Sequence, residues 1–302
     1  MEPWIYLPNP WRDAILALPG EFLGLLEEVR LRLDRPVYCY TTNDVIPLEV
    51  DNQLRTVKEK DLDHIIGIIA EHSLYARTEE LRQGFLTLPG GHRVGVAGKA
   101  VWKDGHIVTM TDISGLNFRR ARNVAGAAAE LVSIFRCQHL SVESLLVAGP
   151  PRSGKTTLLR DLVRIFSDYG ERVTVIDERS ELAAYHGGHY GFDLGAHVDV
   201  LDGWAKAEGI VLAIRTLGPD RIVVDELGNG EDWPAVDQAL STGVKIVASV
   251  HAGTYADLCR KPSRRLPVLH LFDSIVILKR SGIPGAVQEI WHNSQRIWPD
   301  AS

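Results

Sequence analysis

The segment 149–157, GPPRSGKTT, combines residue types at a spacing that is typical of phosphate binding. The fixed positions of the pattern G-x-x-x-x-G-K-[ST] are filled by Gly149, Gly154, Lys155 and Thr156. In such a loop the glycines let backbone N–H groups surround a diphosphate, and the lysine reaches the outer phosphates. The threonine hydroxyl is a ligand for Mg²⁺. The residues expected to bind a nucleoside triphosphate are Gly149, Pro150, Pro151, Arg152, Ser153, Gly154, Lys155, Thr156 and Thr157.

Two adjacent carboxylates end an apolar run at residues 221–226, RIVVDE. In phosphate-loop ATPases the first such carboxylate holds Mg²⁺ through water, and the second polarises the attacking water. We therefore expect Asp225 to serve the metal and Glu226 to act as the general base. The alternative is a strand end that closes on a polar turn, and the phosphate loop upstream in the same domain favours the catalytic interpretation.

Two further apolar runs end in polar side chains. Residues 173–176 lead into Asp177 and Glu178, and residues 245–250 lead into His251. Because the carboxyl ends of parallel strands line the ligand crevice of an α/β sheet, these groups are expected beside the γ-phosphate. Ion pairing in a surface turn is the alternative for the two acids, and a structural role is the alternative for the histidine.

The elements that position these groups alternate in type from residue 144 onward. The apolar run 145–148 predicts a buried strand, and apolar residues at helical spacing follow the loop from Leu158 to Phe166. Candidate strands are residues 144–148, 172–177, 221–225, 244–250 and 274–279. Alternation of strands with helices predicts an α/β domain with a mainly parallel sheet over residues 144–302.

The first 122 residues predict a smaller α+β domain. Apolar residues recur at helical intervals through residues 1–35 and again through 58–72, and residues 85–110 form a β-rich block. Turn signals at residues 89–91 and 103–105 indicate that this block folds into antiparallel strands. An alanine-rich helix is expected within residues 123–143, as a helical linker between the two domains.

Composition supports a protein that contains two domains and carries no strong charge bias. The 302 residues have a net charge of -6 and a mean hydropathy of -0.04, and the charge is spread evenly over both halves. This balance argues against nucleic acid as an obligate ligand. Three scattered cysteines without a C-x-x-C pair fit a reducing cytosol. Without a signal peptide or a membrane-length apolar run, we expect a cytoplasmic protein.

Two local clusters invite other interpretations. His186, His189 and His197 lie in a glycine-rich stretch without the companion ligands of a metal site, so a loop is favoured over metal binding. The basic run at residues 260–265 is interpreted as a solvated loop, with a contact to an acidic partner or lipid as the alternative.

The four strand-end motifs, in this order, resemble the secretion ATPase superfamily of type II and type IV secretion and pilus motors. The matching runs are GPPRSGKTT, VIDERSEL, PDRIVVDELG and the stretch that ends in SVHAGT. Nearly the whole chain is similar to one branch, the stage III sporulation protein AA family of endospore-forming bacteria. The runs that carry this likeness are residues 27–36, 81–100, 113–122, 206–228 and 272–291.

The resemblance implies roles for individual residues. Lys155 and Thr156 match the phosphate and Mg²⁺ ligands of the family, and Glu226 matches the glutamate of its Mg²⁺ strand. Asp225 stands where many of these ATPases have glycine, which restores a conventional metal aspartate. The acidic box reads Asp177-Glu178 here, whereas the motors usually have Glu-Asp. Asp177, Glu178 and Glu226 therefore all remain candidates for the base.

The resemblance also implies cationic groups and an assembly. Arg215 matches an arginine that precedes the Mg²⁺ strand, and Arg93, Arg119 and Arg120 are candidates to reach nucleotide in trans. The implied protein is a RecA-like P-loop ATPase that uses ATP and Mg²⁺ and forms a homo-oligomeric ring, a hexamer. Its implied partners are membrane channel subunits of a sporulation secretion-like complex, contacted from the mother-cell side of the membrane.

Other classes of P-loop protein remain open. A nucleotide-dependent switch is one, although no N-K-x-D run for guanine recognition is present. A RecA-like ATPase that acts on nucleic acid is another. An ABC subunit would need an L-S-G-G-Q-like signature, which the sequence lacks.

Overall fold

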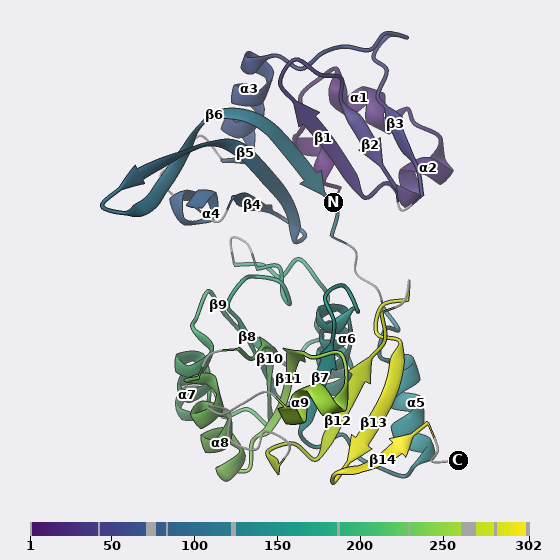
Figure 1. Cartoon of the computed structure of the whole chain (residues 1–302), viewed down its shortest axis with the longest axis vertical. Coiled ribbons are helices and arrows are strands. Elements are labelled where there is room, and N and C mark those ends of the chain that lie inside the picture. Colours follow the sequence, from purple (N-terminus) through teal and green to yellow (C-terminus); the bar gives the residue numbers. More distant parts are fainter. Residues whose placement is uncertain are drawn as a thin grey trace. The chain divides into compact units, whose positions relative to one another are not determined.

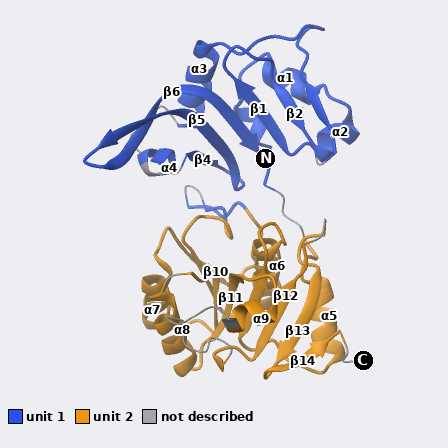
Figure 2. Ribbon diagram, viewed as in Figure 1, with its two compact units in different colours: residues 1–122, 184–191 blue, residues 123–183, 192–302 orange. Residues whose placement is uncertain are grey.

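The computed structural model describes residues 2–41, 43–70, 77–82, 84–121, 125–185, 188–228, 230–260, 270–280 and 283–299. The chain divides into two compact units (Figure 2). Unit 1 comprises residues 1–122 together with 184–191, and unit 2 comprises residues 123–183 and 192–302.

Unit 1 is built on a six-stranded antiparallel sheet, in the order β3-β2-β1-β6-β5-β4 (Figure 1). Its strands are β1 (Glu28–Arg32), β2 (Tyr38–Tyr40), β3 (Val45–Pro47), β4 (Phe85–Leu88), β5 (His92–Lys103) and β6 (His106–Arg119). The expected turns after β4 and β5 are present, since Gly90, Gly91 and Gly105 adopt positive φ there. The antiparallel block predicted for residues 85–110 is therefore confirmed and extends to Arg119.

Helices close one face of this sheet. They are η1 (Pro3–Tyr6), α1 (Trp11–Leu16), α2 (Gly20–Leu25), α3 (Glu59–Ile69) and α4 (Thr78–Arg82). Helix α3 buries Leu62, Ile65 and Ile69 in one core cluster with alternate strand residues such as Val29 and Phe118. Because side chains alternate across a strand, the polar neighbours of these strand residues lie on the opposite face of the sheet.

The prediction that residues 1–35 are helical is wrong for the last part of that stretch. Residues 28–32 form strand β1, in which Val29 and Leu31 are buried between the charged residues Glu28, Arg30 and Arg32. This alternation has a period of two, which is typical of a strand that buries one face. Val29 also fits the helical spacing of the apolar residues before it, so the sequence pattern did not reveal the strand.

Unit 2 contains an eight-stranded sheet, in the order β14-β13-β12-β7-β11-β10-β8-β9 (Figure 1). Its strands are β7 (Leu145–Gly149), β8 (Val173–Asp177), β9 (Val198–Asp202), β10 (Arg221–Glu226), β11 (Lys245–His251), β12 (Ser274–Leu278), β13 (Val287–His292) and β14 (Gln295–Trp298). The six strands from β12 to β9 pair in parallel, whereas β13 and β14 are antiparallel. The sheet is thus mixed, where the sequence predicted a mainly parallel one.

The helices of unit 2 are α5 (Ala129–Cys137), α6 (Lys155–Asp168), α7 (Lys206–Thr216), α8 (Asp232–Ser241) and α9 (Tyr255–Arg260). Strands β7, β11, β10 and β8 are neighbours and run in the same direction, so their carboxyl ends meet at one edge of the sheet. That edge holds Gly149, His251, Glu226 and Asp177. Within the described ranges, no helix has the length and apolar character needed to cross a bilayer.

Candidate active site

The phosphate-loop segment joins β7 to α6 at the carboxyl edge of the sheet. Gly154 begins the helix with φ +87°, a left-handed conformation that L side chains rarely adopt. A Cβ atom at Gly154 would lie 2.5 Å from the backbone nitrogen of Gly285, and that nitrogen donates to the Ser153 carbonyl at 3.1 Å. The β12–β13 turn therefore packs directly on the loop, and only glycine fits at this position.

The Lys155 ammonium group points back over the loop. Its Nζ donates to the carbonyl oxygens of Gly149 at 3.0 Å and Pro150 at 3.2 Å, and it lies 3.2 Å from Nδ1 of His251. Burial lowers the pKa of Lys155, while the carboxylates of Glu226 and Asp225 act in the opposite direction. The predicted phosphate lysine is therefore at the edge where the strand ends meet.

The predicted metal pair is also brought together. Thr156 Oγ1 donates to Asp225 Oδ1 at 3.3 Å, so a hydroxyl of α6 meets the carboxylate at the end of β10. Burial raises the pKa of Asp225 to about 7, and the nearby carboxylates of Glu181 and Asp177 raise it as well. The site thus gathers negative charge that a cation would neutralise.

Glu226 and His251 form the next contact along this edge. His251 Nε2 lies 3.0 Å from Glu226 Oε2, and Nδ1 of the same ring faces Lys155. The Glu226 side chain keeps 38% of its surface exposed and that of His251 keeps 44%. Both side chains are therefore open to solvent, as groups that meet a substrate must be.

The acidic box is held differently. Asp177 is fully buried, and its carboxylate accepts N–H bonds from Glu181, Leu182 and Ala183 at 2.8–2.9 Å. Glu178 forms an ion pair with Lys206 of α7. The two carboxylates lie at the edge that the sequence predicts, and both already have partners that hold the loop.

Arg215 does not reach this edge. It is exposed in the last turn of α7, from which residues 217–220 lead into the beginning of β10. The carboxylates Asp225 and Glu226 lie at the other end of that strand. Within unit 2, the structure therefore separates Arg215 from the predicted groups at the carboxyl ends of the strands.

The three candidate trans arginines belong to unit 1. Arg93 on β5 lies over the Phe85 ring, with its guanidinium carbon 4.6 Å from the ring centre, and Arg119 on β6 pairs with Glu28 at 3.1 Å. Arg120 donates to the carbonyl oxygens of Leu23 and Gly24 at 3.2 Å and to Glu2 at 2.6 Å. Arg120 thus ties chain segments together, whereas the Arg119 side chain is 61% exposed.

The two local clusters are only partly within the structure. His186 and most of the basic run at residues 260–265 lie outside the described residues. Among the residues that the structure does describe, no three His, Cys, Asp or Glu side chains are grouped to hold a metal ion.

A family model and a curated relative identify the same family. A model of the family "Sporulation stage III, protein AA" matches residues 20–297. The chain belongs to this family. It is 35% identical over 297 residues to stage III sporulation protein AA of Bacillus subtilis (strain 168), which covers 96% of the chain and 94% of that relative. The family recognised from the sequence is therefore confirmed.

Solved structures show the fold that this sporulation stage III protein AA family member shares. The ATPase DotB of Yersinia pseudotuberculosis superposes with a TM-score of 0.60 at 16% identity, covering 94% of this chain and 80% of DotB. The pilus retraction motor PilT, solved with bound ADP, gives a TM-score of 0.57 at 16% identity and covers 85% of this chain and 75% of PilT. The likeness places the chain among the folds of these ATPases.

A buried arginine completes the site of this sporulation protein and was not predicted. The guanidinium carbon of Arg160 on α6 lies 3.6 Å from the centre of the Phe192 ring. The same group donates to the carbonyl oxygens of Leu182 at 3.1 Å and Glu181 at 2.8 Å. Burial lowers its pKa to about 10, while Asp177 and Asp225 act in the opposite direction. Arg160 therefore ties the acidic box to the helix that follows the phosphate loop. A charged residue among the apolar positions 158–163 was the signal in the sequence.

We expect Gly154→Ala to weaken ATP binding at least about tenfold and to lower thermal stability by about 1–3 kcal/mol, because the new Cβ meets backbone in a strained conformation. Gly170→Ala is the matched control. Gly170 has φ +83° with nothing within 4 Å of an added Cβ, so it imposes the same strain without the collision. Calorimetric titration and thermal melts of both variants check this. Equal ATP affinities for the two variants would contradict the steric argument.

Asp177 is expected to make stability depend on pH. Burial has the largest effect and raises the pKa of Asp177 from 3.8 to about 6, although the three backbone N–H bonds to the carboxylate lower it. Because the pKa is higher in the folded chain than in the unfolded one, the protonated carboxyl stabilises the fold below about pH 4. This stabilisation is lost as the pH rises to about 6, and the free energy of unfolding falls by about 3 kcal/mol. Urea unfolding across pH 4–7 should show this slope in the parent and not in Asp177→Asn. Parallel curves for the two chains would contradict it.

Proposed function

We propose that the chain binds ATP with Mg²⁺ and hydrolyses it to ADP and phosphate. The observation that carries the proposal is the meeting of three pairs at one sheet edge: Lys155 with His251, Thr156 with Asp225, and Glu226 with His251. These pairs supply a cation to bind phosphate (Lys155), a hydroxyl and a carboxylate to bind Mg²⁺, and a solvent-exposed carboxylate (Glu226). Phosphoryl transfer requires these three kinds of group. The fold shared with DotB and PilT supports it.

The residues present fit a nucleotide and its metal. Ser153 Oγ, inside the loop, is buried and has no hydrogen-bond partner among the described residues, which suits a group placed to meet a phosphate. Thr156 and Asp225 would hold Mg²⁺, and the phosphates would complete its oxygen ligands. The ion supplies neutralisation of the charge on the phosphates. The neighbouring carboxylates that raise the pKa of Asp225 also place negative charge around the proposed Mg²⁺ position, and this charge favours a bound cation.

We assign the general base to Glu226. Asp177 has its carboxylate filled by three backbone N–H groups, and Glu178 is paired with Lys206. Among the described residues, Glu226 pairs through Oε2 with the partly exposed His251, and Oε1 is the oxygen that we propose to orient a water. His251 holds this carboxylate toward Lys155, which favours a positioning role for the histidine.

We further propose that the active form is a ring, a hexamer, which energises assembly of or transport through a secretion-like channel during sporulation. Membership of the family supports the sporulation context, and the likeness to DotB and PilT supports a motor. Such a protein would work in the cytoplasm, on the mother-cell side, where partner proteins hold it at the membrane. Arg93 and Arg119 are the arginines that we propose to reach a neighbour's nucleotide, since Arg120 is held within unit 1.

Mixing two inactive chains tests both hydrolysis and the ring. We expect Arg119→Ala to lower turnover about 10³-fold or more with little change in ATP affinity, because a trans arginine acts on the transition state. Mixing it with Lys155→Ala chains should restore part of the activity, and light scattering with ATP and Mg²⁺ should show a ring. The control is Arg12→Ala, at an arginine on α1 whose side chain is 41% exposed. A monomer that binds ATP and never hydrolyses it would replace the motor with a nucleotide switch.

A further inference from the structure

The open face of the unit 1 sheet carries a concentration of positive charge. The side chains on this face of β1, β5 and β6 include Arg30, Arg32, Arg93 and Arg119 and one acid, Glu28. These five side chains sum to +3 in a chain whose overall charge is -6. The helices of unit 1 pack in the core on the other face. This asymmetry is invisible in the charge of the whole sequence.

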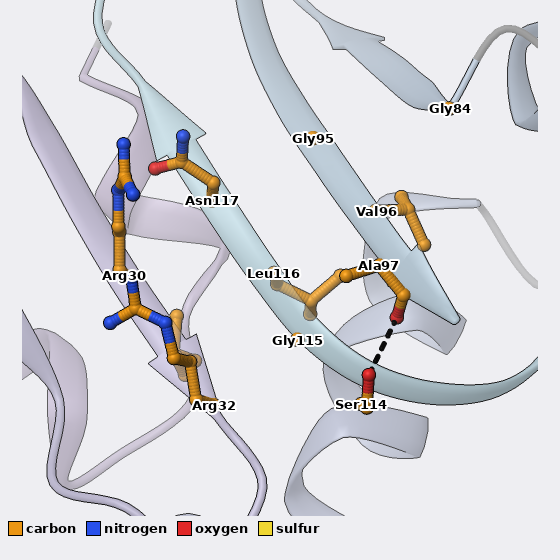
Figure 3. A pocket seen from close by; sticks show the side chains of 11 residues that line it. Arg30, Arg32, Gly84, Gly95, Val96, Ala97, Ser114, Gly115, Leu116 and Asn117 are labelled. Atoms are coloured by element: carbon orange, nitrogen blue, oxygen red, sulfur yellow. Dashed lines mark hydrogen bonds between the residues drawn. The ribbon is translucent and has the colours of Figure 1, made fainter.

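A shallow pocket of about 350 Å³ lies on this face (Figure 3). Its volume is within the range of about 300–1,000 Å³ that is typical of small-molecule sites. Gly95 on β5 and Gly115 on β6 form its floor, and Arg30 and Arg32 on β1 line one side. The two glycines alternate with Ala97 and Asn117 on this face, so a flat group can approach the backbone at the glycines themselves.

The two arginines retain hydrogen-bonding capacity. Arg30 donates to Glu28 through Nε and Nη2, at 2.9 and 2.7 Å, and Glu28 also pairs with Arg119. Arg32 is exposed and forms no ion pair within the described part of the chain. Two guanidinium groups at alternate positions of one strand suit an anion that carries two charges, such as a phosphate monoester, better than a single carboxylate.

Asn117, which lines the same pocket, holds an unsatisfied acceptor. Asn117 on β6 pairs in register with Arg30, and its Oδ1 atom is buried without a hydrogen-bond partner among the residues that the structure describes. A buried polar atom left unpaired costs about 1–3 kcal/mol, so such atoms usually have a partner when the site is filled. The missing partner is an N–H or O–H donor. A ligand for this pocket therefore carries a donor as well as an anion.

We propose that this pocket binds a nucleoside monophosphate, separately from the phosphate loop. The phosphate meets Arg30 and Arg32, the flat base lies over Gly95 and Gly115, and a base amino group or ribose hydroxyl donates to Asn117. All of the lining residues come from unit 1, so the site needs no other part of the chain.

Calorimetric titration of AMP into the full-length Lys155→Ala chain tests this site. AMP lacks the β- and γ-phosphates that a phosphate loop holds, so the loop contributes little to its binding. We expect about one AMP per chain. Arg32→Gln should weaken that binding at least about tenfold, since it removes a charged hydrogen-bond donor. Lys60→Gln, the same charge change at an exposed position of α3, should leave the affinity unchanged.

Two further variants test the pocket floor at Gly95 and the hydrogen-bond acceptor of Asn117. Gly95→Val should abolish AMP binding and still fold, because a Cβ there lies 3.6 Å from Asn117 Cβ, an ordinary contact. Asn117→Leu should weaken AMP binding and leave binding of inorganic phosphate unchanged.

The proposal is overturned if Lys155→Ala chains take up no AMP, or if Arg32→Gln binds AMP as tightly as its parent. It is also overturned if a hexaglutamate peptide binds in an Arg32-dependent manner while AMP does not, which would make the face a docking surface for acidic protein. Should Gly95→Val fail to fold in circular dichroism, the Arg32→Gln result decides.

Discussion

Glu226→Gln is expected to give a chain that binds ATP and holds it unhydrolysed. The amide keeps the size of the side chain but removes the charge that would polarise water, so turnover should fall about 10²–10⁴-fold. ATP affinity should change little, because Lys155 and the loop remain intact. Filter binding together with single-turnover hydrolysis measures both quantities on the same preparation.

Matched variants decide whether this result identifies the base. Glu178→Gln removes a carboxylate from the acidic box that is already paired with Lys206, and it should retain most of the turnover. Glu231→Gln, at an exposed position beside α8, controls for loss of charge near the strand end. If Glu178→Gln or Asp177→Asn stops hydrolysis while Glu226→Gln does not, the base lies in the acidic box and our assignment is wrong.

Lys155→Ala is the second variant with a large expected effect. Hydrolysis should fall at least about 10²–10³-fold, because the ammonium group neutralises charge that develops on the transferred phosphoryl group. Truncation also frees the carbonyl oxygens of Gly149 and Pro150, which Lys155 contacts here, so ATP affinity should fall too. Steady-state phosphate release and nucleotide titration measure the two effects.

Lys245→Ala provides the comparison for this variant. Lys245 begins β11 at the opposite edge of the sheet and pairs with Glu143 at 3.0 Å, a partly exposed ion pair worth about 0–1 kcal/mol. It should hydrolyse ATP at the parental rate. A Lys155→Ala chain that matches it in activity would remove Lys155 from the mechanism.

The strand ends of unit 2 could be predicted because each buried run ends in polar residues. Apolar runs such as 145–148 and 222–224 indicate buried strands, and the carboxyl ends of parallel neighbours must meet. The structure brings Lys155, Asp225 and His251 together at that edge. Strands β13 and β14 escaped prediction because they interleave polar residues with buried or half-buried ones over only four to six positions.

The hydrogen-bond and ion-pair partners of the charged side chains could not be predicted from residue type. Asp177 is buried under three N–H bonds, Glu178 is paired with Lys206, and Arg120 is occupied by backbone carbonyl groups. Each looks like a free charged residue in the sequence. Arg160 is the reverse case, since a charged residue inside an apolar helical stripe contacts a loop more than twenty positions away. Such contacts depend on tertiary packing, which local spacing does not encode.

The division of the chain singles out one short segment, residues 184–191. Residues 184–191 belong to unit 1 although both flanking segments belong to unit 2, so the backbone passes between the units three times. The second passage follows directly after Ala183, whose N–H donates to Asp177 at 2.8 Å, and the third precedes Phe192, which lies under Arg160. Both ends of this segment are therefore anchored within unit 2, beside the phosphate loop, one by the Asp177 carboxylate and the other by the Arg160 guanidinium group.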